Sequence, residues 1–114
     1  MKTILYHNPR CSKSREAKNL LEEQNCSFEI KEYLKEGPTF QEMKDLVKML
    51  GIHPLELIRK GEAIYKSDYK GKEFSEQEWL EILVKHPILI ERPILIQGSK
   101  AVIGRPPTLV LDLI

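Results

Sequence analysis

Apolar positions in the first part of the chain follow two different periods. Thr3–His7 is a short, mostly apolar run that predicts a buried strand. A helical pattern begins at Ser12, and Asn25 is its expected C-cap. The apolar face of this helix consists of Ala17, Leu20 and Leu21. Apolar and charged residues alternate in Phe28–Lys31, as in a half-exposed strand. A strand, a helix and a strand in about 30 residues predict a βαβ unit with parallel strands and a right-handed crossover.

Two capping boxes predict the starts of two further helices. In Thr39–Glu42 and Ser75–Glu78 a hydroxyl and a carboxylate stand three residues apart, ahead of apolar positions with helical spacing. In such a box each side chain satisfies a backbone N–H group that the helix itself leaves free. We expect the first helix to end at Gly51 and the second near His86.

The remaining segments predict shorter elements. Pro54 favours the first turn of a short helix that continues through Leu55–Arg59, and the polar segment Gly61–Lys72 is predicted to be a loop. Ile94–Ile96 and Ala101–Ile103 flank a turn and predict a tight antiparallel hairpin. Thr108–Ile114 is predicted to be a short terminal helix.

The order of these elements indicates the fold class. A βαβ unit, then helices, then two strands and a helix is the order of a thioredoxin-like α/β fold. It would have a mixed four-stranded sheet and a helical insertion between the second and third strands. A chain of 114 residues fits one domain over residues 1–114, and it is long enough to bury a core without disulfides or metals.

Composition and charge exclude several classes of protein. Hydrophobic residues make up 41% of the chain and charged residues 31%, which argues against disorder. Eighteen basic residues oppose 17 acidic ones, so no broad positive field predicts a nucleic-acid partner. No apolar run approaches the about 20 residues that span a membrane, and the N-terminus lacks the apolar core of a signal peptide. We therefore expect a cytoplasmic protein in which both cysteines are reduced.

Cys11 is the first candidate for chemistry. It stands where the first strand's loop turns into the first helix, near free backbone N–H groups and the positive end of the helix dipole. Arg10, Lys13, Arg15 and His7 are close in sequence, and each favours a thiolate over a thiol. The same donors would hold a small oxyanion. The alternative interpretation is an ordinary small residue beside a solvated basic patch.

The other cysteine is predicted to be structural. Cys26 lies 15 residues beyond Cys11, at the far end of the helix, which is about 20 Å along the axis. A disulfide requires Cα atoms within about 7 Å, so Cys26 cannot resolve an oxidised Cys11. The position that would complete a C-x-x-C motif is Ser14. An external thiol must therefore reduce Cys11 after any oxidation. His7, His53 and His86 show no spacing that predicts a metal site.

Three arginines are candidate oxyanion ligands. Arg92 precedes Pro93, and in a thioredoxin-like sheet the proline before this strand is usually cis and faces the active cysteine. Arg105 follows the hairpin, and Arg59 ends the predicted short helix. Each alone is better read as a solvated surface arginine. Together with Cys11 they suggest a guanidinium clamp, because the planar fork of arginine donates paired hydrogen bonds.

Two motifs resemble a known family. His7–Arg15, with the sequence HNPRCSKSR, resembles the N-terminal signature of glutaredoxin-coupled arsenate reductases. Glu91–Ile94 and Lys100–Pro107, with the sequences ERPI and KAVIGRPP, resemble their C-terminal signature. The similarity runs essentially from end to end, and the two motifs stand in the same order.

The resemblance implies a thioredoxin-like fold and a specific chemistry. Cys11 would be the nucleophile that attacks arsenate, and His7 would lower the pKa of its thiol. Arg59, Arg92 and Arg105 would hold the arsenic oxyanion. Glutathione would act as co-substrate on the cysteine-bound arsenate, and glutaredoxin would resolve the mixed disulfide. No bound cofactor, metal, nucleic acid or membrane is implied.

The wider family leaves two alternatives open. One is a glutathione-dependent thiol reductase that acts on a substrate other than arsenate. The other is a regulator that binds RNA polymerase, like the Spx-type proteins, which usually carry C-x-x-C at this site. Ser14 argues against a redox switch of the Spx type but not against polymerase binding.

Overall fold

The computed structural model describes residues 2–114, which form two compact units. Among these residues, unit 1 consists of residues 2–36 and 92–114, and unit 2 consists of residues 37–91. Unit 2 is thus the helical insertion expected between the second and third strands. Each unit is described by itself below, and the expectation of a single domain over 1–114 stays a prediction.

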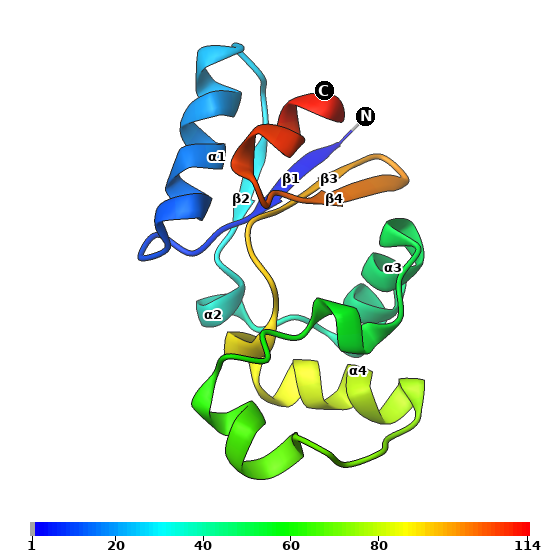
Figure 1. The fold of residues 1–114 in the computed structure, drawn as a ribbon. Helices are drawn as coiled ribbons and strands as arrows, with labels where there is room; N and C mark the ends of the chain where they lie inside the picture. The colour runs from blue at the N-terminus through cyan, green and yellow to red at the C-terminus, as the bar shows by residue number, and fades with distance from the viewer. Residues whose placement is uncertain (1) are drawn as a thin grey trace. The chain divides into compact units, whose positions relative to one another are not determined.

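Unit 1 is built on a mixed sheet of four strands (Figure 1). The strands are β1 (Thr3–Tyr6), β2 (Glu29–Lys31), β3 (Ile94–Gln97) and β4 (Lys100–Ile103). Their order is β2-β1-β3-β4. β1 and β2 are parallel, while β3 is antiparallel to both β1 and β4. The predicted parallel pair and the predicted hairpin are therefore both confirmed.

One face of this sheet is covered by two helices that lie side by side in Figure 1. They are α1 (Ser12–Glu23) and the C-terminal 3₁₀ helix η4 (Pro107–Asp112). The fully buried residues of this core are Leu5, Ala17, Leu21, Leu95 and Val110. Ala17 and Leu21 belong to the apolar face predicted for the first helix. On the other face Tyr6 stacks on Tyr33, with ring centroids 6.0 Å apart. Tyr33 begins the short helix α2 (Tyr33–Glu36).

Unit 2 contains two α-helices and three short helical turns. The elements are α3 (Phe40–Leu50), η1 (Pro54–Leu57), η2 (Tyr65–Tyr69), α4 (Glu76–Lys85) and η3 (Pro87–Leu89). Both predicted capping boxes are formed, with Thr39 and Ser75 as the N-caps. Gly51 ends α3 in the left-handed conformation, with φ at 68°, as its position predicts.

Two predicted elements need correction. The helix expected over Leu55–Arg59 is a 3₁₀ turn that ends at Leu57, so Arg59 lies beyond it. The loop expected over Gly61–Lys72 contains η2, a π-helical turn whose Tyr65 and Tyr69 rings pack near Trp79. Burial of these rings orders a segment whose polar composition suggests a loop.

Element boundaries differ by one or two residues elsewhere. β1 ends at Tyr6, although the His7 N–H still donates to the Lys31 carbonyl at 3.0 Å. The C-cap of α1 is Gln24, and Asn25 follows it in the left-handed conformation with φ at 55°. The terminal helix is of the 3₁₀ type and starts one residue earlier than predicted. Within residues 2–114, no helix combines the length and apolar character needed to cross a membrane.

Candidate functional site: Cys11 and two arginines

Cys11 is the N-cap of α1, and its side chain caps nothing. Its backbone is extended, with φ at −94° and ψ at 122°, and its thiol makes no capping hydrogen bond. No acidic residue occupies the first turn of α1. The first backbone N–H groups of an α-helix have no partner within the helix and carry its positive partial charge. The thiol thus lies at a positive helix end that no carboxylate of the first turn neutralises.

The surroundings of Cys11 favour its thiolate. Partial burial by itself would raise the pKa of the thiol. The nearby backbone N–H of Ser14, the guanidinium of Arg92 and the backbone N–H of Lys13 each favour the negative sulfur and lower the pKa of the thiol, and the positive charge of Arg92 adds to their effect. These contacts together outweigh the burial, so the pKa of Cys11 lies below its ordinary value. Cys11 therefore carries more negative charge near neutral pH than a free cysteine does.

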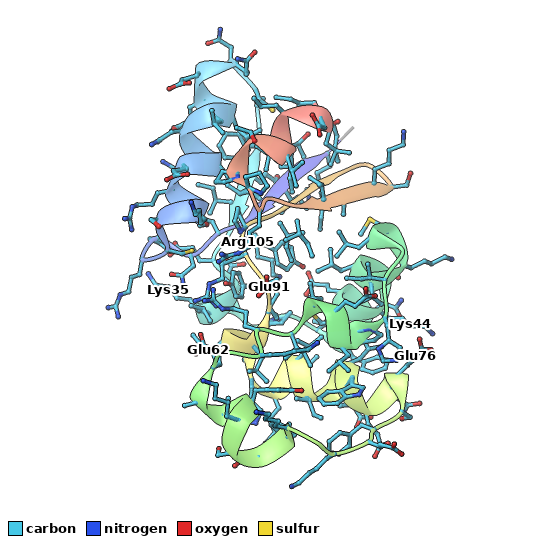
Figure 2. All side chains as sticks on the ribbon, viewed as in Figure 1. Lys35, Lys44, Glu62, Glu76, Glu91 and Arg105 are labelled. Atoms are coloured by element: carbon cyan, nitrogen blue, oxygen red, sulfur yellow. The ribbon has the colours of Figure 1, made fainter. Side chains whose placement is uncertain are left out.

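The hairpin places a second arginine at the same sulfur. Ile94 pairs with Ile103 across β3 and β4, and this register continued past the strand ends sets Arg92 opposite Arg105. The Arg105 Nε–H donates to the Arg92 carbonyl at 2.8 Å. The Arg105 Nη2–H donates to Cys11 Sγ at 3.9 Å, and Figure 2 labels Arg105 just after β4. Two of the three predicted arginines are thus brought to the predicted nucleophile.

Gly104 makes the close approach of these two segments possible. Its N–H donates to the Pro93 carbonyl at 2.8 Å. A Cβ at Gly104 would lie 2.9 Å from Pro93 Cγ and 3.1 Å from Val110 Cγ1, so a side chain would push the segments apart. The Arg92–Pro93 peptide bond is cis, as the fold analogy predicts, and the Arg105–Pro106 bond is cis as well.

The sequence predicts that His7 acts on Cys11, but in the structure the His7 side chain contacts Ser14. His7 Nδ1 lies 2.6 Å from the Ser14 hydroxyl oxygen, which also accepts a hydrogen bond from the Asn8 N–H at 3.0 Å. The histidine is the one partner found for the hydroxyl hydrogen among the described residues, so the Ser14 O–H donates to Nδ1 and the ring proton is on Nε2.

The charge state of His7 agrees with this tautomer. Burial and the nearby positive charge of Lys18 lower the pKa of His7, against the opposing effect of Glu32. The ring is therefore neutral at pH 7 and does not act on Cys11 as a cation. It touches the site through Ser14, whose backbone N–H reaches the sulfur. A catalytic role for His7 stays a prediction.

Arg59 belongs to unit 2, in the segment after η1. Its backbone N–H donates to the Leu89 carbonyl at 2.7 Å, and its Nε lies 3.5 Å from a carboxylate oxygen of Glu62. Its Nη1 is buried and has no hydrogen-bond partner among residues 2–114. A buried donor of this kind gains free energy from an acceptor. Binding of an oxyanion by Arg59 stays a prediction.

Ser14 is the residue whose importance the sequence did not reveal. Its side chain is fully buried and links His7 to the loop that precedes Cys11. From the sequence, Ser14 is notable only as the residue at the position that would complete a C-x-x-C motif. Its spacing holds a further signal, because Ser14, Ala17 and Leu21 follow the buried face of one helix. A hydroxyl on such a face needs a partner inside the protein.

The second cysteine and the metal-ligating side chains add nothing to this site. Cys11 and Cys26 are both free thiols. Cys26 packs against the apolar core at the far end of α1, which fits a structural role. Among residues 2–114, no group of three or more His, Cys, Asp or Glu side chains is arranged to hold a metal ion.

Comparison with known proteins identifies the family of this chain. The profile described as the ArsC family matches residues 6–113, which include Cys11 and both arginines beside it. The chain belongs to the ArsC family. Its similarity to the family therefore covers almost the whole sequence and both units.

Individual ArsC relatives are similar over their full length. An arsenate reductase from Haemophilus influenzae is 40% identical over 116 residues, which cover 100% of both chains. YfgD, an uncharacterized protein from Escherichia coli, is 42% identical over 112 residues, or 96% of this chain and 94% of the relative. The solved structure of an arsenate reductase from Vibrio cholerae is 38% identical and superimposes with a TM-score of 0.94. It covers 100% of this chain and 98% of that one, and the predicted thioredoxin-like α/β fold is confirmed.

Proposed function

We propose that this ArsC-family protein is an arsenate reductase in which the Cys11 thiolate attacks arsenic. The observation that carries the proposal is the surroundings of Cys11 Sγ. Backbone N–H groups at the start of α1 and the guanidinium groups of Arg92 and Arg105 all reach this atom. Groups that stabilise a thiolate also stabilise a tetrahedral oxyanion beside it. The similarity to arsenate reductases from Haemophilus influenzae and Vibrio cholerae supports the choice of arsenate.

The first step forms a sulfur–arsenic bond. The Cys11 sulfur attacks arsenic, and one arsenate oxygen leaves as water after it takes up protons. Arsenic remains in the +5 state, and the enzyme carries a cysteine–arsenate ester. Arg92 and Arg105 would hold the remaining oxygens, and their fixed positive charge offsets the charge on the group. Arg59 is proposed as a third ligand because its buried Nη1 has no hydrogen-bond partner in residues 2–114.

An external thiol then supplies the electrons. The sulfur of glutathione attacks Cys11 Sγ, a disulfide forms between them, and the sulfur–arsenic bond pair stays on arsenic, which leaves as arsenite. A thiol of glutaredoxin next attacks the glutathione sulfur and frees Cys11 as a thiol. Ser14 supports this sequence because the position that would supply an internal second thiol holds a hydroxyl. Cys26 is partly buried and packs against the core at the other end of α1.

The experiment that tests the proposal measures arsenite formed from arsenate with glutathione, glutaredoxin and a glutathione-recycling system. Wild type and Cys11→Ser are compared, and circular dichroism checks that both are folded. We expect turnover by wild type and none above background by Cys11→Ser. Equal turnover by both proteins would contradict a role of Cys11 as nucleophile.

A second assay tests the glutathione-dependent thiol reductase that the family also contains. It follows reduction of a glutathionylated peptide by wild type in the absence of arsenate. If the peptide is reduced and no arsenite forms in the first assay, the substrate that reacts at Cys11 is a disulfide and not arsenate. Pull-down against RNA polymerase tests the regulatory alternative.

A further inference from the structure

Unit 1 contains a pocket of about 360 Å³ next to the loop that carries Cys11. The loop residues His7–Arg10 form one wall, and Glu32, Leu34 and Lys35, from the end of β2 through α2, form the other. Figure 2 labels Lys35 on α2. The volume lies within the range of about 300–1,000 Å³ that small-molecule sites occupy. The pocket and Cys11 are adjacent in the chain, because Cys11 follows Arg10 directly and donates its N–H to the Asn8 carbonyl at 3.0 Å.

A buried histidine lines this pocket with one nitrogen still available. His7 is only 5% exposed, and its Nδ1 is occupied by the Ser14 hydroxyl. Nε2 therefore carries the ring proton, and no acceptor for it is found among residues 2–114. The Nε2–H group can donate a hydrogen bond to a ligand that enters the pocket. His7 is thus suited to bind an acceptor atom of a molecule in the pocket.

The charged side chains of the pocket fit a ligand with more negative than positive groups. Arg10 and Lys35 supply two cations, and Glu32 supplies one carboxylate. Lys35 Nζ lies 3.6 Å from the Glu32 carboxylate, but its side chain remains 78% exposed and free to meet another partner. A ligand with two carboxylates and one ammonium group would complement this set.

Each wall of the pocket also has an apolar side chain that is exposed to solvent. Leu34 is 40% exposed, and Pro9 on the opposite wall is also exposed. Together they offer apolar contact to the methylene groups and backbone of a small peptide. The pocket therefore combines charge selection at its edges with apolar contact between them.

We propose that this pocket binds the external thiol of the reaction as an acidic thiol peptide, glutathione. The inference rests on the proposed function and adds where the co-substrate binds. Glutathione has two carboxylates for Arg10 and Lys35 and one ammonium group for Glu32. As a tripeptide it extends about 10 Å, so a molecule seated beside Arg10 can bring its thiol to the next residue, Cys11. The arginines at Cys11 Sγ remain free for the arsenic oxyanion.

Binding is tested without any reaction, with S-methylglutathione as the probe. Nuclear magnetic resonance follows the backbone amide signals of wild type during titration, in the absence of arsenate. We expect shifts at Arg10, Leu34 and Lys35, and a dissociation constant about tenfold higher in Lys35→Glu. Lys100→Glu makes the same charge change on the exposed start of β4 and should bind like wild type. Shifts confined to other residues, or equal affinity in Lys35→Glu, would overturn the assignment.

Steady-state kinetics test the same pocket during turnover. For Lys35→Glu we expect the KM for glutathione to rise about tenfold, with the KM for arsenate and the kcat at saturating glutathione unchanged. Turnover supported by dithiothreitol, an uncharged dithiol, should not change. An equal loss with both thiols would contradict a glutathione pocket. If wild type forms no arsenite, the proposed function fails while the S-methylglutathione titration still decides the binding site.

Discussion

The starts of α1 in unit 1 and of α3 and α4 in unit 2 solve one physical problem in opposite ways. Every helix begins with backbone N–H groups that lack partners. In α3 and α4 a hydroxyl and a glutamate form a complete capping box, and acidic residues occupy the first turn. In α1 the N-cap is Cys11, its side chain makes no capping bond, and the first turn holds no acidic residue.

This difference separates helix ends that stabilise the protein from one that is available for chemistry. The capping boxes consume the donors and neutralise the helix dipole within unit 2. At α1 the corresponding donors remain uncapped near the Cys11 sulfur, and they lower the pKa of its thiol. The stability that a cap would add is given up at one helix start, and the result is a positive site that suits a thiolate and an oxyanion.

The largest effect is expected when the start of α1 is made to resemble those of α3 and α4. In Cys11→Asp a carboxylate can accept from the free N–H groups and pair with Arg105. We expect arsenite formation to fall roughly a thousandfold or more, because the nucleophile is lost. The free energy of unfolding should rise by about 1 kcal/mol, because the helix gains a cap. Assay of turnover and urea unfolding on the same sample checks both, and a destabilised variant would contradict the comparison.

A smaller loss of activity is expected when the positive charge at the site is kept but the planar guanidinium group is removed. Arg92→Lys and Arg105→Lys should each lower kcat/KM for arsenate by about tenfold to a hundredfold, since lysine cannot donate paired hydrogen bonds. Arg92→Lys should also raise the pKa of Cys11, which thiolate absorbance during a pH titration measures directly. Kinetics like those of wild type in both variants would show that these arginines do not hold the substrate.

The caps of unit 2 should affect stability and leave chemistry unchanged. Ser75→Ala removes the hydroxyl that accepts from the Glu78 N–H, and we expect the free energy of unfolding to fall by about 1 kcal/mol. Cys11→Ala is the matched change at α1, where no capping bond exists, and it should alter stability by less than about 0.5 kcal/mol. Urea unfolding of the two variants tests this contrast. Equal losses would mean that Cys11 also caps its helix.

The smallest expected effect is a difference in the pH at which the His7 region of unit 1 and the α4 cap of unit 2 lose stability. The folded-state pKa of His7 lies below its ordinary value of about 6.5, so acid favours the unfolded state, which takes up the proton first. Stability from this region is present above about pH 6.5 and is lost as pH falls through the folded-state pKa. The backbone N–H and hydroxyl of Ser75 lower the pKa of Glu78 below its ordinary value of about 4.5, so the cap of α4 loses stability only in more acidic solution.

Unfolding experiments at several pH values measure this difference. Wild type should begin to lose stability as the solution is acidified below about pH 6.5, and His7→Gln should lose less over that window. Glu78→Gln should match wild type there and differ only below about pH 4.5. A steeper loss in His7→Gln than in wild type would contradict the neutral histidine described here.

Local signals predicted most of the fold. The two capping boxes lie within four residues each, and their hydrogen bonds form between the residues that carry the pattern. The turn at Gly98 sets the hairpin register in the same way. The π-helical turn Tyr65–Tyr69 escaped prediction because its order depends on rings that pack near Trp79, outside the segment itself.

The candidate site was predicted in part. Cys11 could be placed at a helix start because strand, turn and helix follow one another directly in the sequence. The position of Arg92 and Arg105 opposite each other also follows from the hairpin register once the turn is known. The role of Ser14 could not be assigned, because its hydroxyl bonds to His7 and Asn8, which precede it by seven and six residues in the loop after β1.

The sequence by itself determined which chemical groups this protein has, where its two capped helices begin, and that Cys11 stands at the start of a helix. These features depend on contacts between residues a few positions apart, which residue type and spacing specify. Only the tertiary structure decided which groups meet. Arg105 reaches the sulfur of a cysteine 94 residues away because the sheet brings β1 and the hairpin together. Ser14 and Asn8 likewise fix the tautomer and position of His7, because a buried polar group must find its partner within the folded chain.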